Sequence, residues 1–148
     1  NVMNVARKKG EAVASLFPDD VVLSTDTIVC LDGKIYGKPK DRKDAYNTLA
    51  TFSGMTHEVV SGVSIISRKL NMTMYVKSYV TFKKLTKEMI DEYLKTDEPY
   101  DKAGSYAIQG KGRSLIEGYS GSLYNIVGLP IEYIKDMLRV ILNEVENR

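Results

Sequence analysis

The segment VVLSTDTIVCLDGKIYG, residues 21–37, decides the fold. Its first part, residues 21–31, is rich in β-branched side chains and too apolar for a surface strand, so we predict a central strand covered on both faces. Asp32-Gly33 then predicts a tight turn into a short strand, KIYG. Asp26 interrupts the apolar run, where a buried carboxylate is costly unless a partner compensates it. Asp26 therefore either faces a cleft at a strand end or accepts backbone hydrogen bonds at a turn, and this segment alone leaves both interpretations open.

The rest of the chain alternates helical and strand patterns. Residues 57–67 and 73–85 are β-rich runs separated by a short polar stretch, which predicts an antiparallel hairpin. The pattern is that of an α/β protein, and the hairpin argues against a purely parallel sheet. Apolar spacing and capping residues predict helices over residues 2–17, from Asp41 to about Ser53, from Thr86, and from Pro130 onward.

Length and composition narrow the possible functions. A chain of 148 residues is the size of one domain, and 21 Lys and Arg against 19 Asp and Glu leave a charge of +2. This balance argues against a dedicated nucleic-acid or anionic-membrane binder. The chain has one cysteine, Cys30, and one histidine, His57. A lone cysteine cannot form an internal disulfide, and one cysteine with one histidine cannot supply the ligands of a zinc finger, so both classes are excluded. Without a membrane-length apolar run or a signal peptide pattern, we expect a cytoplasmic protein.

The segment at residues 97–112 combines charge with glycine and has little periodicity, which is typical of a functional loop. Glu98, Asp101 and Lys102 lie within five positions there. Carboxylates beside a lysine suit a divalent cation and a polyphosphate, because hard cations favour oxygen ligands and phosphates favour ammonium groups. The alternative is a solvated charged loop. The glycine spacing does not match a Walker-type phosphate loop.

Three further residues have a plain interpretation beside a functional one. Lys9 belongs to a basic run on the first helix, which is typical of a solvated face. Lys38, in GKPK, can reach Asp26 if the KIYG strand pairs back on the central strand. His57 precedes a strand without an evident nucleophile partner, and we interpret it as a structural imidazole.

Five segments, in order, resemble the Maf family of nucleotide pyrophosphatases. Each segment alone is weak evidence. The short motifs DTIV, GKP, DKAG, IQG and NIVGLP, which lie within these segments and occur in this order, are together specific for the family. Thr27 after Asp26, and Gln109 within IQG, are similar to the branch that acts on dTTP and UTP. The segments are ARKKGEAVA, STDTIVCLDGKIYGKPKD, LATFSG followed by His57 and Val59, EPYDKAGSYAIQGKG, and GSLYNIVGLP.

The resemblance implies hydrolysis of a nucleoside triphosphate between its α- and β-phosphates, with a divalent cation such as Mg²⁺ or Mn²⁺. Asp26 corresponds to the proton acceptor that activates water. This role is physically reasonable, because an ionised carboxylate in a cleft can take a proton while ammonium groups offset the phosphate charge. Lys9 and Lys38 are carried over as contacts to the phosphates or the transition state.

The same resemblance assigns the residues that bind the rest of the substrate. Thr27 and Gln109 correspond to base-selecting residues, and a Gln amide offers the donor and the acceptor that suit the O4/N3 edge of uracil or thymine. Glu98 and Lys102 match the family's substrate-binding loop. The candidate metal ligands are Asp26, Glu98 and Asp101.

The implied fold is a mixed, twisted sheet flanked by helices, with two lobes and a central cleft, as in the related inosine-triphosphatase fold. The expected partners are a nucleoside triphosphate and a second copy of the chain, with no nucleic acid and no membrane. We expect residues 1–148 to form one Maf-like domain without the family's N-terminal strand and SxSPRR-like phosphate loop. Gly10, where the family usually has Ala, should soften the first helix by about 1 kcal/mol.

Two other functions stay open from the sequence. One is a pyrophosphatase for non-standard purine triphosphates, since the inosine-triphosphatase fold has this architecture. The other is a non-catalytic, nucleotide-binding regulator of cell division, in line with the family's association with inhibition of septum formation.

Overall fold

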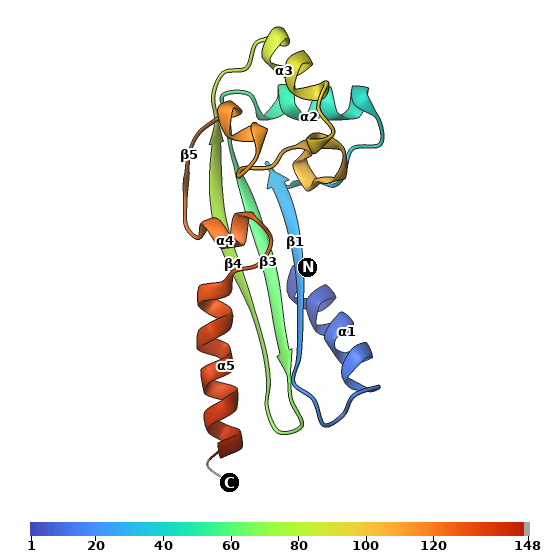
Figure 1. Ribbon diagram of the computed structural model, residues 1–148, viewed down its shortest axis with the longest axis vertical. Coiled ribbons are helices and arrows are strands. Elements are labelled where there is room, and N and C mark those ends of the chain that lie inside the picture. The colour runs from blue at the N-terminus through green and yellow to red at the C-terminus, as the bar shows by residue number, and fades with distance from the viewer. Residues whose placement is uncertain (147–148) are drawn as a thin grey trace.

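A computed structural model of the chain describes residues 1–146, in which five strands and five α-helices are joined by loops that include three short 3-10 helices (Figure 1). The elements are α1 (Val2–Ala14), β1 (Val22–Leu31), β2 (Lys34–Tyr36), α2 (Arg42–Phe52), β3 (Thr56–Ile66), β4 (Asn71–Phe82), α3 (Lys87–Leu94), η1 (Glu98–Asp101), η2 (Ala103–Ser105), η3 (Lys111–Leu115), β5 (Ile116–Ser120), α4 (Leu123–Ile126) and α5 (Ile131–Glu146).

The strands form one sheet in the order β2-β1-β3-β4-β5. The predicted α/β class and the predicted hairpin, which is β3 and β4, are confirmed. Each pairing in the described residues is antiparallel, whereas we expected a mixed sheet. For β1–β2 and β3–β4 the reason is a short connecting turn, which only antiparallel neighbours allow; the β1–β3 and β4–β5 pairings are antiparallel across longer connections.

Strand β1 is the element that carries Asp26. It pairs with β3 along nearly its whole length, but β2 pairs only with its last three residues, Val29 to Leu31. Within the described residues, no strand therefore lies beside the other edge of β1 at Asp26 and Thr27. The predicted burial on both faces is not found: Val29 and Leu31, which share one face, are buried, whereas Ile28 and Cys30 on the other face and the middle of the strand are only half-buried.

The helix caps follow the sequence signals closely. Asp41 accepts a hydrogen bond from the Asp44 amide at 2.8 Å, and Thr86 accepts one from the Met89 amide at 3.1 Å. Both side chains satisfy amide groups that the first turn of a helix leaves free. Helix α1 ends at Ala14 rather than at Phe17 as predicted, because the side chains that follow it turn to solvent instead of packing on the sheet.

Helix α1 lies directly against one face of β1 and β3, where two glycines allow the close approach. A Cβ atom on Gly10 would lie 2.8 Å from Ser24 Oγ, and one on Gly62 would lie 2.2 Å from the Val2 carbonyl oxygen. Ser24 Oγ also donates to the Ala6 carbonyl across this contact. Gly10 therefore does more than soften the helix, since it makes room for the packing of α1.

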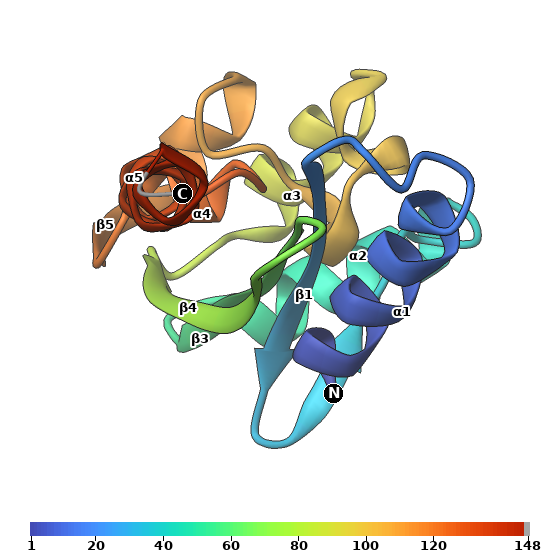
Figure 2. The ribbon, with the colours of Figure 1, turned by 90° about the horizontal axis from the view of Figure 1, so that it is seen from below.

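The apolar side chains form two cores along the length of the sheet. Helices α2 and α3 cover one end (Figure 1), and α5 packs against the β3–β4 hairpin on the face opposite α1 (Figure 2). Leu142, on the same helix, is exposed. Among residues 1–146, no helix has the length and apolar character needed to cross a bilayer. The second core consists of Val63, Ile65, Ile134, Met137 and Ile141.

Candidate active site

Asp26 lies in the middle of β1 with its carboxylate directed toward α1. The Lys9 amino nitrogen is 3.3 Å from Asp26 Oδ1, and the two side chains are 57% and 23% exposed. The functional interpretation of both residues is therefore consistent with the geometry, because a partly accessible carboxylate lies beside an ammonium group. Asp26 is in regular strand pairing opposite Gly62, so it is not the turn residue of the alternative interpretation.

Thr27 occupies the opposite face of the same strand, because successive side chains in a strand alternate. Its hydroxyl lies 2.7 Å from Ser61 Oγ, on the neighbouring strand β3, and 3.5 Å from the Gly128 carbonyl oxygen. These two contacts hold Thr27 between the sheet and the turn that follows α4.

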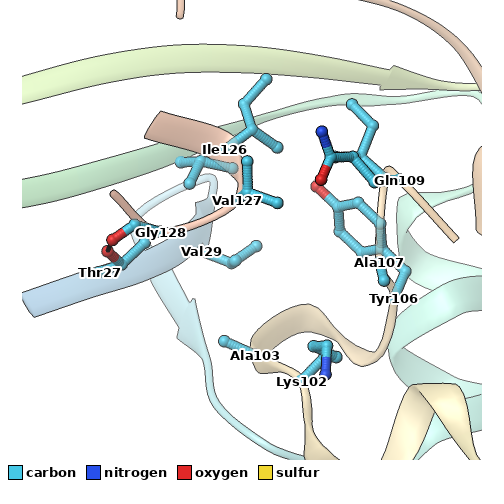
Figure 3. A pocket seen from close by; sticks show the side chains of 12 residues that line it. Thr27, Val29, Lys102, Ala103, Tyr106, Ala107, Gln109, Ile126, Val127 and Gly128 are labelled. Carbon is cyan, nitrogen blue, oxygen red and sulfur yellow. Dashed lines mark hydrogen bonds between the residues drawn. The ribbon is translucent and has the colours of Figure 1, made fainter. Parts of the chain in front are cut away.

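A cavity of about 220 Å³ opens beside Thr27 (Figure 3). We call it the loop pocket. Its volume is below the range of pockets that enclose a complete drug-sized ligand, so it suits a single ring rather than a whole nucleotide. Its walls come from β1, β3, the segment 102–109 and the turn 126–128, and are formed by Thr27, Val29, Val59, Lys102, Ala103, Tyr106, Ala107, Ile108, Gln109, Ile126, Val127 and Gly128.

Two predicted substrate residues line the loop pocket across from Thr27. Gln109 is exposed, and within residues 1–146 its side-chain amide has no hydrogen bond. Lys102 donates to Asp101 at 2.9 Å. The Lys102 hydrogen bond is the main cause that holds the pKa of Asp101 below its usual value, and Lys38 adds to the effect. Thr27, Gln109 and Lys102, to which the resemblance gives substrate-binding roles, thus line one pocket.

Lys38 does not join Asp26. Although the KIYG segment pairs back on β1, Lys38 follows the end of β2 and is exposed, and the described residues contain no ion pair between it and Asp26. It lies instead near Asp101, at the end of the sheet where the Gly104 amide donates to the Gly37 carbonyl at 3.2 Å. The predicted catalytic set is therefore divided between two places.

Glu98 is held by its own chain. Its carboxylate accepts hydrogen bonds from Tyr93 Oη at 2.5 Å, from the Lys111 amide at 2.9 Å and from the Gly112 amide at 2.8 Å. Burial raises the pKa of Glu98, but these hydrogen bonds outweigh it and hold the pKa below its usual value. The charge of Lys102 also lowers the pKa of Glu98, but within residues 1–146 Glu98 makes no hydrogen bond or ion pair with Asp101 or Lys102.

Comparison with known proteins places this arrangement in a family. The Maf family profile, described as Maf-like protein, matches residues 1–141. The chain belongs to the Maf family. A dTTP/UTP pyrophosphatase of Bacillus cytotoxicus is 48% identical over 130 residues, which are 88% of this chain and 68% of that protein. A dTTP/UTP pyrophosphatase of Bacillus pumilus is 47% identical over 131 residues, 88% of this chain and 69% of that protein.

The Maf-family segment at His57 has a structural role, as the sequence predicts. His57 is 1% exposed, its Nε2 lies 2.6 Å from Tyr106 Oη, and its ring stacks on Phe52 with 4.4 Å between centroids. Burial lowers the pKa of His57 to about 4. The imidazole is therefore neutral at pH 7 and supports Tyr106, which lines the loop pocket.

Sequence reasoning missed several walls of this Maf-family site. The sequence has ten tyrosines, and no pattern distinguishes Tyr106 from the others. Val127 and Gly128 lie in the NIVGLP motif, but nothing in that motif indicates that they face Thr27 of β1. Only the folded chain brings these segments together.

The described residues also limit how a metal could bind. Residues 1–146 contain no group of three or more His, Cys, Asp or Glu that could hold a metal ion. The carboxylate of Glu98 accepts three hydrogen bonds from the protein, whereas Asp26 and Asp101 each accept one, from a lysine. Asp26, which is partly accessible, fits the usual binding of Mg²⁺ through one or two carboxylates together with substrate phosphates.

Proposed function

We propose that this Maf-family protein is a nucleoside triphosphate pyrophosphatase that converts dTTP, UTP and modified pyrimidine nucleotides to the monophosphate and pyrophosphate. The observation that carries this proposal is the arrangement on β1. One strand presents an accessible carboxylate beside an ammonium group, at Asp26 and Lys9, and a ring-sized pocket at the next residue, Thr27. The names of the two Bacillus relatives support the choice of substrate.

A substrate can reach both faces of β1 by crossing its edge. Asp26 and Thr27 point to opposite faces, and the described residues place no strand beside this edge. We propose that the base enters the loop pocket and that the triphosphate passes over the edge toward Asp26. This arrangement also explains why the pocket needs to hold only one ring.

In the proposed mechanism, Asp26 accepts a proton from the attacking water. The water oxygen forms a bond to the α-phosphorus, and the bond between that phosphorus and the oxygen bridging it to the β-phosphorus breaks, so that pyrophosphate leaves. Lys9 lies close enough to Asp26 to offset the negative charge that builds on the phosphates. Lys38 and Lys102, near Asp101, provide further ammonium groups for the phosphate chain.

A divalent cation, Mg²⁺ or Mn²⁺, is part of the proposal. Asp26 is the carboxylate that fits it, together with phosphate oxygens of the substrate. When bound, such a cation supplies a Lewis acid that polarises a phosphoryl oxygen. Asp101 is a second candidate ligand, because Lys102 engages only its Oδ1 and the side chain is exposed.

Base selection is assigned to Gln109 and Thr27. The free amide of Gln109 offers one donor and one acceptor to the O4/N3 edge of uracil or thymine. Thr27 is fixed by Ser61, so its position is set before a ligand arrives. Cytosine presents the reverse pattern, a donor at N4 and an acceptor at N3, so this site disfavours it only when the Gln109 amide keeps the orientation that suits O4.

The experiment is a product analysis with the full-length protein and Mg²⁺. UTP, dTTP, CTP and ITP are supplied separately, and the products are resolved by chromatography. We expect monophosphate and pyrophosphate from UTP and dTTP, with CTP and ITP converted more slowly. Faster conversion of ITP would favour the purine alternative. Binding of UTP without turnover would favour the non-catalytic regulator.

The family resemblance supports three broader proposals. We propose that residues 1–148 form one domain, that the protein works in the cytoplasm where the nucleotide pool is found, and that it forms a homodimer. Analytical ultracentrifugation of the full-length protein tests the last of these.

A further inference from the structure

Two side chains hold both ends of the loop that presents Gln109. Tyr93 Oη accepts a hydrogen bond from the Ala107 amide at 3.2 Å and donates to Glu98 Oε2 at 2.5 Å. Glu98 in turn accepts from the Lys111 and Gly112 amides at 2.9 and 2.8 Å. We call Tyr93 and Glu98 the loop clamp, because they bind the main chain on both sides of Gln109.

The clamp leaves no space for a side chain next to it. A Cβ atom on Gly110 would lie 1.7 Å from Glu98 Oε1, and one on Gly112 would lie 2.6 Å from the Ala107 carbonyl oxygen. The main chain therefore passes directly against the carboxylate. The Gly110 amide also donates to the Ala107 carbonyl at 3.4 Å, which closes the turn around Gln109.

Gln109 depends on this support because its own side chain has none. Within the described residues its amide makes no hydrogen bond, while it lies at the wall of the loop pocket (Figure 3). Its place in the pocket is consequently set by the main chain alone. The main chain, in turn, is held by hydrogen bonds to Tyr93 and Glu98. Glu98 is an ionised acceptor, and hydrogen bonds to an ionised group are stronger than those between neutral groups.

We propose that Tyr93 and Glu98 are positioning residues that set pyrimidine selectivity through Gln109. This inference rests on the proposed function, and it gives Glu98 a role other than the substrate contact that the family resemblance implies. Tyr93 lies on the buried face of α3, so the position of the loop is tied to the core at that end of the sheet. Selectivity is then a property of the loop and its anchor together.

The first test is a double-mutant cycle of Glu98→Gln and Gln109→Ala. The readout is the ratio of kcat/KM for UTP to that for CTP. In Glu98→Gln, an NH₂ group replaces one carboxylate oxygen and faces a hydrogen-bond donor, such as the Lys111 or Gly112 amide. Two donors cannot bond to each other, so we expect the loop to shift. We expect each single variant to lower the ratio by about tenfold, and the double variant to match Gln109→Ala alone. Additive effects would contradict action through Gln109.

The second test measures the loop directly. Hydrogen exchange of the Lys111 and Gly112 amides should accelerate by about tenfold or more in Glu98→Gln, because both amides lose their acceptor. Tyr93→Phe removes the hydroxyl and should accelerate exchange of the Ala107 amide. It also serves as a second variant if Glu98→Gln does not fold. The matched control for Glu98→Gln is Glu92→Gln. It removes an exposed carboxylate from α3, the helix that carries Tyr93.

The outcomes separate the two proposals. If the wild-type protein converts neither UTP nor CTP, the proposed function fails, while unchanged amide exchange in both clamp variants overturns the clamp itself. An equal loss of kcat for UTP and CTP in Glu98→Gln, with the ratio unchanged, also overturns the positioning role, because Glu98 would then act on the reacting groups.

Discussion

The two faces of β1 are built in different ways. On the α1 face, Asp26 and Lys9 share one hydrogen-bonded ion pair, and Lys9 is more than half exposed. On the other face, the walls of the loop pocket are fixed by the buried His57–Tyr106 hydrogen bond and by the loop clamp, in which Tyr93 is buried and Glu98 is half-buried. A single strand thus separates an accessible charged pair from a firmly supported pocket.

This difference fits two tasks. A general base must meet water and phosphates, so it has to remain accessible, and its weak ion pair costs little to rearrange. Groups that select a base must be held in place before the ligand arrives, since a small misplacement weakens the discrimination. The comparison therefore predicts losses of rate from the α1 face and losses of selectivity and stability from the pocket side.

The largest expected effect is on rate. Asp26→Asn removes the proposed proton acceptor with almost no change in shape, and should lower kcat for UTP by about 10²- to 10⁴-fold. Continuous measurement of pyrophosphate release checks this. The matched control is Asp19→Asn, which removes an exposed carboxylate paired with Arg68. A variant at Asp26 that keeps a third of the wild-type rate would refute the assigned role.

The next effect concerns the buried imidazole on the pocket side. The pKa of His57 is about 4 in the folded protein, against an unperturbed value of 6.5. Below pH 6.5 the unfolded chain takes up a proton that the folded protein refuses, so stability falls as the pH drops and the loss is complete near pH 4. The expected loss is about 3 kcal/mol, measured by urea unfolding.

The same prediction has a direct spectroscopic check. His57 is the single histidine of the chain, so its imidazole gives one resolved NMR titration. A midpoint near pH 6.5 in the folded protein would show that the ring is not desolvated, and the contrast between the two faces would then weaken.

A smaller effect is expected where α1 meets the sheet. Gly62→Ala places a Cβ atom on the Val2 carbonyl, which has no flexible end that can move aside. The free energy of unfolding should fall by about 2 kcal/mol, and hydrogen exchange in α1 should accelerate. Gly118→Ala is the control, since nothing lies within 4 Å of its Cβ position. Equal stability of the two variants would mean that α1 is not closely packed on β3.

The smallest expected change is the loss of the Lys9–Asp26 ion pair. Lys9→Met should alter the free energy of unfolding by less than about 1 kcal/mol, because the pair is largely solvated. The same variant should slow pyrophosphate release if Lys9 offsets phosphate charge. Thermal unfolding and an activity assay, run together, distinguish the two contributions. A stability loss of several kcal/mol would make Lys9 a structural residue.

Much of the local structure could be predicted because it depends on neighbours in the sequence. The caps at Asp41 and Thr86 were predictable, since a capping side chain bonds to an amide only three residues away. The β3–β4 hairpin follows from two β-rich runs and a short polar link. The ion pair between Lys9 and Asp26 was not predictable from charge patterning alone, which indicates only a solvated face.

The site was predictable in part. The resemblance indicated Thr27, Gln109 and Lys102, and these residues line one pocket. It also implied a contact between Glu98 and substrate, but the fold directs that carboxylate to amides thirteen and fourteen residues further along. Lys38 likewise lies near Asp101 instead of Asp26. The reason is that β2 ends at Tyr36, so strand pairing does not hold Lys38 beside β1.

The sequence by itself determined the family, the order of helices and strands, and the chemical types that the site offers. These properties depend on motif order, on hydrophobic period and on side-chain chemistry, all of which are local. Only the tertiary structure decided that Lys9 lies beside Asp26, that Tyr106 and Gly128 form walls of the pocket, and that Tyr93 and Glu98 hold the Gln109 loop. Such contacts join segments far apart in the chain, and their geometry is set by how α1, α3 and the turn after α4 pack on the sheet.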